Sequence, residues 1–298
     1  MKKVVKVKIV GGLGNQLFQF YAGVYLATRT DSELILDFSK VGISGTVHGS
    51  SIDQLVTGNE YQVQLRKISF LESFFWRIHQ KLVREIKNLR FLSLKILRVY
   101  QSNQIGFDPM IAELTSPVEI QGYFQSWRYL EYCRAAGIED PKLKTPSIWY
   151  ENLREKIVSE KAIGLHVRRG DYLSLTDSFG ILCKCYYDDA LNKALAKNPG
   201  RTVYVFSDDI EYALTLFPGT DFNFVSEPKD SIAAETMFLM SACSSLIIAN
   251  STFSWWAAAL GDVEKDIYAP QKWFRSLEDP KDLTPENWIP VKCCWMDN

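Results

Sequence analysis

The stretch VVKVKIVGGLGNQLFQFYAGVYLATRT, residues 4–30, decides the fold class. It opens with an apolar-rich segment, Val4–Val10, and passes through three glycines into a pattern where apolar residues recur every three or four positions. That spacing places apolar side chains on one face of a helix. The next segment, Glu33–Phe38, reads as a second strand. A strand, a glycine turn, a helix and a strand in this order predict the start of a doubly wound parallel sheet.

The same alternation continues along the chain. In the first half we also predict a helix over Phe74–Tyr100, a strand over Val118–Gln125 and a helix over Ser126–Gly137. The predicted strands of the second half are Ala162–Val167, Arg201–Asp209, Asp221–Ser226, Ser244–Asn250 and Lys265–Pro270, and the predicted helices are Tyr186–Lys197, Ile210–Phe217, Ser231–Cys243 and Ser251–Gly261.

The pattern breaks at Glu139–Ser147, which contains two prolines. A break of this kind is typical of a boundary between lobes. We therefore predict an α/β protein of two Rossmann-like lobes, residues 1–150 and 151–298, that face each other across a cleft.

Composition excludes several classes of protein. Lysine and arginine number 34 against 35 acids, so the chain lacks the basic surplus of a general nucleic-acid binder. The six cysteines match no common zinc motif and there are three histidines, so we expect no metal site and reduced thiols. The sequence shows neither a signal-peptide pattern nor an apolar run of about 18 residues, which favours a cytoplasmic location.

In an open parallel sheet, ligands bind beyond the carboxyl ends of the strands. The second lobe is expected to place cations, acids and hydroxyl groups at these ends: His166, Arg168, Arg169 and Asp171; Ser207, Asp208 and Asp209; Asn250, Ser251, Thr252 and Ser254.

Each group has a plain structural interpretation beside the functional one. An arginine fork suits a phosphate, but it also suits a structural pair with an aspartate such as Asp171. The helix start at Asn250 or Ser251 attracts anions, but its side chains also cap the helix. Asp208 and Asp209 could hold a metal, accept hydrogen bonds from a guanine edge, or cap the next helix.

The glycine loop of the first lobe has two interpretations. Gly12 and Gly14 follow a strand, and Asp37 ends the next one, which partly matches a dinucleotide-binding fingerprint and favours an NAD-dependent oxidoreductase. However, the position of the third glycine is Leu17. The alternative is that the loop backbone approaches a sugar or phosphate, with Asn15 and Gln16 supplying amide hydrogen bonds.

Five motifs occur together in one order: GGLGNQLFQF, GYFQSWRY, HVRRGDY, FSDD and NSTFSWWAA. In this order and spacing the chain resembles the bacterial α-1,2-fucosyltransferases of glycosyltransferase family 11 over nearly its whole length. The resemblance implies two lobes in the GT-B arrangement and GDP-β-L-fucose as donor. It further implies inversion to an α-1,2 linkage on a β-galactoside and no metal requirement, so GDP-fucose is a co-substrate and no cofactor is expected.

The resemblance also implies roles for individual residues. Arg168 meets the diphosphate and Asn15 lies near the reacting sugar, so these two are the expected catalytic residues. The expected substrate-binding residues are Gly14, Gln16, His166, Arg169, Asp171, Asp208, Asn250, Ser251, Thr252, Phe253 and Ser254, with His166 and Asp208 on the guanine side and residues 251–254 at the phosphates. The base for the acceptor hydroxyl stays open between Asp171, Asp177 and the phosphate itself.

Residues 75–98 carry seven lysines and arginines against one acid, Glu85. A basic amphipathic helix can lie on an anionic membrane surface, and bacterial relatives of this kind commonly decorate lipid-linked O-antigen units. The plain interpretation is a solvated face on a helix packed against the core. A non-catalytic nucleotide-sugar-binding protein of the same fold is the third candidate function, beside the transferase and the oxidoreductase.

Overall fold

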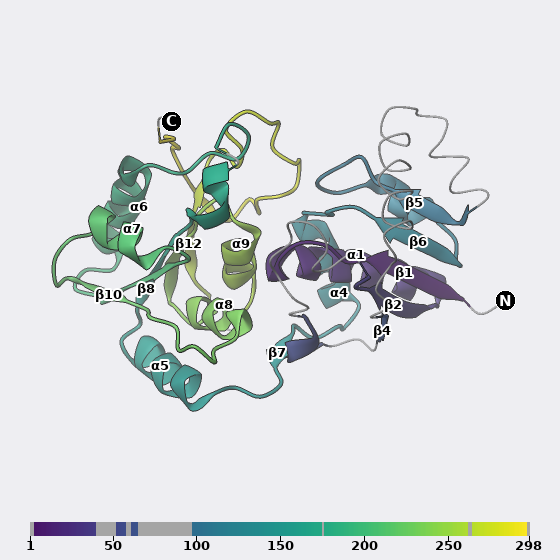
Figure 1. Ribbon diagram of the computed structural model, residues 1–298, viewed down its shortest axis with the longest axis horizontal. Coiled ribbons are helices and arrows are strands. Elements are labelled where there is room, and N and C mark those ends of the chain that lie inside the picture. The colour runs from purple at the N-terminus through teal and green to yellow at the C-terminus, as the bar shows by residue number, and fades with distance from the viewer. Residues whose placement is uncertain are drawn as a thin grey trace. The chain divides into compact units, whose positions relative to one another are not determined.

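The computed structural model describes residues 3–39, 52–57, 61–64, 97–174, 176–261 and 264–296, which fall into two compact units (Figure 1). The first unit comprises Met1–Lys142 and Pro280–Leu283, and the second comprises Leu143–Asp279 and Thr284–Asn298. The chain passes from one unit to the other a few residues before the predicted boundary at 150. The short return of Pro280–Leu283 to the first unit is a feature that the sequence did not predict.

The first unit is built on a five-stranded parallel sheet. Its strands are, in order across the sheet, β4 (Gln62–Gln64), β2 (Glu33–Asp37), β1 (Val4–Lys8), β6 (Val118–Gln121) and β5 (Val99–Gln101). The helices α1 (Leu13–Thr30) and α4 (Trp127–Ala135) pack against each other, and α1 lies along β1 and β2 (Figure 1). The shorter elements are η1 (Ile52–Gln54), β3 (Leu55–Val56), η2 (Pro109–Glu113) and β7 (Lys142–Leu143).

The second unit is built on a six-stranded parallel sheet. Its strands are, in order, β10 (Phe222–Phe224), β9 (Val203–Ser207), β8 (Ile163–Val167), β11 (Ser245–Ile247), β12 (Asp266–Pro270) and β13 (Ile289–Val291). One face is covered by α6 (Lys184–Lys197) and α7 (Ile210–Leu216), and the other by α5 (Ile148–Ser159), α8 (Ala233–Ser241) and α9 (Thr252–Ala259) (Figure 1). A 3-10 turn, η3 (Gly170–Ser174), follows β8.

The α/β prediction is confirmed, because both sheets are parallel and helices separate most of their strands. Trp255 and Trp256 of α9 are fully buried. The predicted helix over 74–100 is wrong at its end, where β5 begins at Val99, and residues 74–96 lie outside the described residues. Two further elements, α5 and β13, were not predicted from the sequence. Within the described ranges, no helix is both long enough and apolar enough to cross a membrane.

In each sheet the first strand, β1 or β8, lies in the interior. The chain first adds strands on one side of it and later adds strands on the other side. The order β2-β1-β6 places a switch of direction between β1 and β6, and the order β9-β8-β11 places one between β8 and β11. At such a point the loops beyond the strand ends diverge and leave a crevice for a ligand. The predicted site residues of both units follow these strands.

Close packing of α1 on the sheet depends on Gly23. A methyl group added there would lie 2.9 Å from Leu34 Cδ1 and closer still to the Val7 side chain. We predict that Gly23→Ala destabilises the protein by about 1–3 kcal/mol, because the helix must move away from its sheet. Urea unfolding measures the change. Thr28→Ala, on the exposed side of the same helix, is the control and should stay within about 0.5 kcal/mol; equal effects of the two variants would contradict the packing argument.

Candidate functional site

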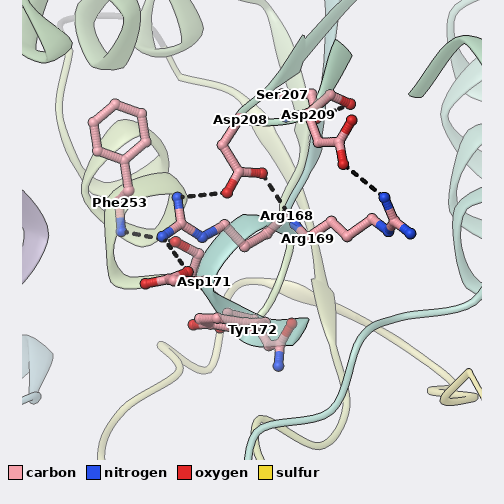
Figure 2. A network of polar contacts seen from close by, with 10 residues as sticks. Arg168, Arg169, Asp171, Tyr172, Ser207, Asp208, Asp209 and Phe253 are labelled. Atoms are coloured by element: carbon pink, nitrogen blue, oxygen red, sulfur yellow. Dashed lines mark hydrogen bonds and ion pairs between the residues drawn. The ribbon is translucent and has the colours of Figure 1, made fainter. Parts of the chain in front are cut away.

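Arg168 lies beyond the carboxyl end of β8, and its guanidinium group is held by two acids (Figure 2). Nη2 lies 2.6 Å from Asp171 Oδ1, and Nη1 lies 3.1 Å from Asp208 Oδ2. The guanidinium carbon lies 5.4 Å from the centre of the Tyr172 ring. The buried Nε has no hydrogen-bond partner among the described residues. The group is therefore fixed in position while one of its donors stays unused.

Arg169 turns to a different acid, as the alternation along a strand predicts (Figure 2). Its Nη1 lies 2.7 Å from Asp209 Oδ2, and its guanidinium stacks 4.4 Å from the centre of the Tyr212 ring. Asp209 also caps α7, because its Oδ1 accepts the Tyr212 N–H at 3.0 Å. This backbone hydrogen bond and then the Arg169 contact hold the pKa of Asp209 below its usual range. Asp209 is thus the helix cap that the sequence left as one of three possibilities.

Asp208 connects the two arginines. Its Oδ1 accepts the backbone N–H of Arg169 at 3.0 Å, while its Oδ2 meets Arg168. Gly170 makes this approach possible, because a side-chain carbon there would collide with the Asp208 carboxylate. The glycine in the RRGD motif is therefore a requirement of close contact between the β8 and β9 loops.

His166 lies buried at the end of β8, with 3% of its surface exposed. Burial, with a further contribution from the Arg168 charge, lowers the pKa of His166 to about 3. Its ring centre lies 6.1 Å from that of Phe253, and its Nδ1 has no partner in the described part of the chain. At neutral pH the imidazole is uncharged, so it can hydrogen-bond to a neutral group but cannot neutralise a phosphate.

The start of α9 faces the same end of the sheet. Ser251 is its N-cap, as predicted, and its hydroxyl accepts the Phe253 N–H at 3.3 Å. Ser254 is fully buried and donates to the Ala249 carbonyl at 3.2 Å. Thr252 and Phe253 are partly exposed. The two serines therefore shape the helix start, whereas Thr252 and Phe253 form its accessible surface.

Asn250 is buried beneath this helix start. Its amide donates to the Phe179 carbonyl at 3.0 Å and to the Trp273 carbonyl at 3.1 Å. Its own carbonyl accepts the Tyr172 hydroxyl at 2.8 Å. Asn250 thus joins the loop that follows Arg168 to the end of β11, and its amide N–H groups are engaged within the protein.

Amide side chains gather in the loops at the switch point of the first unit. Asn15, at the start of α1, accepts a 3.0 Å hydrogen bond from Gln125, which follows β6. Gln16 is fully buried; its Nε2 donates to the Gly11 carbonyl at 3.0 Å and its Oε1 accepts the Ile52 N–H at 3.3 Å. Gly14 is buried in the same helical turn. Asn15 therefore has a partly exposed side chain in this loop, whereas the side chain of Gln16 is buried and bonded within the protein.

Sequence reasoning missed two residues here. Gln125 lies within one of the five motifs but was assigned no role. It follows β6, which pairs with β1, so the loops after these two strands, with Gln125 and Asn15, end at the same edge of the sheet. Gln19 accepts the Val10 N–H at 2.9 Å and donates to the Gly122 carbonyl at 3.2 Å, which joins the two loops of the switch point. A glutamine on a helix face carries no sequence signal for such a bridge.

The oxidoreductase interpretation fails at Asp37, the acid that would bind a ribose. Its side chain is buried and lies 2.8 Å from Lys6 Nζ and 2.7 Å from Lys8 Nζ. Burial alone would raise the pKa of Asp37, but hydrogen bonds from these lysines and Ser39 hold it well below its usual range. A carboxylate closed in by two ammonium groups is not available to a ribose, so the NAD-dependent alternative is withdrawn.

No acid near Arg168 belongs to a metal-binding group among the described residues. The three metal-ligating side chains that do come together are Cys183, Cys185 and Cys294. The acids around Arg168 are instead paired with cations.

The neutral state of His166 has a measurable consequence for stability. In the unfolded chain its imidazole takes up a proton near pH 6.5, whereas in the folded protein it does so near pH 3. The unfolded state thus binds more protons below pH 6.5, so stability is complete above that pH and falls as the pH is lowered. Between pH 7 and pH 5 we predict that wild-type protein loses about 2 kcal/mol more than His166→Gln, measured by urea unfolding. The same acid sensitivity in both proteins would contradict the assignment.

Comparisons with known proteins show which proteins this chain is similar to. The model of the family described as "Glycosyl transferase family 11" matches residues 121–291. An Escherichia coli alpha-1,2-colitosyltransferase is 29% identical over 97% of this chain and 99% of its own length. The Escherichia coli O-antigen biosynthesis glycosyltransferase WbnK is 36% identical over 46% of this chain and 48% of its own length.

A solved structure, fucosyltransferase NodZ from Bradyrhizobium, aligns with 87% of this chain and 93% of its own at 16% identity and a TM-score of 0.49. The family match covers more than half of the chain, including both arginines and the three aspartates around Arg168 and Arg169. The chain belongs to glycosyl transferase family 11, whose members act on nucleotide sugars.

Proposed function

We propose that the protein is an inverting α-1,2-fucosyltransferase that moves L-fucose from GDP-β-L-fucose to the 2-hydroxyl of a terminal β-galactoside. The proposal assigns the donor to the second unit and the acceptor side to the first. It also holds that no metal ion takes part. The observation that carries it is the guanidinium of Arg168, fixed by two acids at a sheet switch point next to the start of α9.

The chemistry of transfer needs positive charge at one place. The acceptor oxygen bonds to C1 of the sugar while the bond from C1 to the β-phosphate oxygen breaks, and GDP leaves with the electron pair. The acceptor hydroxyl proton passes to a base or to the departing phosphate. Negative charge therefore grows on the β-phosphate, where fixed donors stabilise the transition state most effectively.

Arg168 and α9 suit this task for physical reasons. A guanidinium presents several N–H donors in one plane and stays charged at all relevant pH values. The first turn of a helix adds free N–H groups and the positive end of its dipole. Asp171 has a side chain that is 53% exposed, so of the two acids on Arg168 it moves away at the lower cost when a diphosphate arrives.

The donor sugar is tested with two nucleotide sugars. One relative's name specifies colitose, which is L-fucose without its 3-hydroxyl group. GDP-fucose and GDP-colitose are each offered with a panel of β-galactosides, with and without EDTA, and GDP release and the anomeric configuration of the product are measured. We expect α-linked product from GDP-fucose that EDTA does not reduce. Faster transfer from GDP-colitose would move the donor assignment to that sugar. Loss of activity in EDTA that magnesium or manganese ions restore, and zinc ions do not, would overturn the metal-free scheme.

A non-catalytic nucleotide-sugar-binding protein is the second candidate. It predicts GDP binding without product and without slow hydrolysis of GDP-fucose in the absence of acceptor. Hydrolysis at a measurable rate, abolished in an Arg168 variant, would exclude it.

Arg168→Ala should lower turnover about 10²–10³-fold, because a fixed donor to the growing charge is lost. Steady-state GDP release measures the effect, and circular dichroism checks the fold. Arg201→Ala is the matched control: this arginine bonds to Ser244 Oγ at 2.7 Å and precedes β9, at the opposite end of that strand from Asp208. An Arg168 variant with turnover within threefold of the control would remove Arg168 from the mechanism.

Asn15→Ala separates the two units in function. We expect transfer to fall at least about tenfold, since the acceptor or sugar loses a positioned amide. The affinity for GDP, measured by calorimetry, should change less than twofold, because the proposed nucleotide contacts all belong to the second unit. A parallel loss of GDP affinity would contradict the division of roles.

A further inference from the structure

Three cysteines converge at the start of α6. We call Cys183, Cys185 and Cys294 the thiol triad. Their Cα atoms lie 5.4, 5.6 and 6.9 Å apart, and each sulfur contacts the other two. Cys294 is 111 residues from Cys183 and 109 from Cys185, which is why no local spacing motif reveals the group.

The backbone fixes the triad in place. The Cys183 N–H donates to the Cys294 carbonyl at 2.9 Å, and the Met296 N–H donates to the Ile181 carbonyl at 2.8 Å. Between them, Leu182 and Trp295 form an antiparallel bridge. The segment after β13 thus runs as a short strand beside the residues that lead into α6. The three sulfurs are brought together by paired backbone, which lowers the entropy cost of binding one ligand with all three.

Cys183 lies within disulfide range of both other cysteines, with Cα separations of 5.4 Å to Cys185 and 5.6 Å to Cys294. One sulfur atom forms one disulfide bond, so any pair leaves the third thiol over. The third pair, Cys185 and Cys294, has a Cα separation of 6.9 Å, at the edge of the usual range of about 4.4–6.8 Å. A thiophilic metal ion, in contrast, bonds to several thiolates at once.

The position on α6 favours thiolates. Cys183 is the N-cap of this 14-residue helix and its side chain makes no capping hydrogen bond, while Cys185 lies in the first turn. The positive end of the helix dipole stabilises a negative sulfur at both places. Cys185 is exposed and the other two are partly exposed, so an ion can reach all three.

The remaining cysteines differ in each respect. Cys133 and Cys243 are buried, and burial raises the pKa of each thiol to about 12. Cys293 neighbours the triad in sequence, but its sulfur contacts the backbone of Lys272 instead, with the N–H at 3.2 Å and the carbonyl at 3.3 Å. Cys293 therefore provides a matched control.

We propose that the thiol triad binds one zinc ion through three thiolates, with water or a small anion as the fourth ligand. On binding, three S–H bonds break, their protons pass to the buffer, and three zinc–sulfur bonds form. The ion would fasten the segment after β13 to the start of α6. Asn250 holds the Phe179 carbonyl, a few residues before that start, so the site would steady the far end of the loop that begins at Arg168. This role is structural and does not depend on the proposed transfer reaction.

The test uses the full chain, freed of metal and reduced with a non-thiol reductant. Cobalt(II) serves as a visible substitute for zinc, and we expect one equivalent to give the thiolate-to-cobalt charge-transfer band and the ligand-field bands of a tetrahedral site. Zinc should displace it. Zinc at a hundredfold excess over its dissociation constant should raise the unfolding temperature by about 5 °C.

Variants assign the ligands. Cys183→Ser, Cys185→Ser and Cys294→Ser should each weaken zinc binding at least about tenfold, whereas Cys293→Ser should bind as the wild type does. Cys185→Ser carries the test if another variant fails to fold, because its exposed side chain lies outside the backbone pairing. A reduced wild-type chain without the cobalt–thiolate band, or triad variants that bind zinc as tightly as Cys293→Ser, would overturn the proposal.

Discussion

The ion pairs of Arg168 are the constraint on which the rest of the site depends. A guanidinium group at the end of a buried strand requires compensating negative charge, which Asp171 and Asp208 supply. Asp208 can reach it because Gly170 has no side chain, and His166 stays neutral partly because the same positive charge lies close by. The positive charge of Arg168 thus accounts for the two aspartates and the glycine in the loops after β8 and β9, and it contributes to the neutral state of His166 in β8.

The two units use one topological device with different chemistry. Each unit places loops at the point where the order of its strands reverses. This point lies between β1 and β6 in the first unit and between β8 and β11 in the second. The first unit gathers the amides of Asn15 and Gln125 there, and the second gathers arginines and carboxylates. Amides suit the neutral hydroxyl groups of a sugar, whereas fixed cations suit a diphosphate. The division of proposed roles follows from this difference.

Several residues of the sequence motifs are buried and make hydrogen bonds within the protein. They hold the exposed motif residues in position. Gln16 joins its own loop to Ile52, Asn250 joins the Phe179 loop to β11, and Ser254 bonds within the turn before α9. A buried polar group must find such partners, since an unpaired one costs about 1–3 kcal/mol. In motifs such as GNQ and NSTFS, the partly exposed residues can contact a ligand, and the buried residues support them.

The sequence by itself determined most of the alternation of strands and helices and the class of the fold, because both follow from local periodicity and from glycine positions. Short elements with weak patterns, such as β13, and the helix α5 were not predicted from the sequence. The tertiary structure alone decided which acid meets which arginine, that Asp37 is closed off by Lys6 and Lys8, and that Cys294 joins Cys183 and Cys185. These contacts depend on strand order and on pairing between segments far apart in the chain. Neither can be deduced from the local spacing of residues.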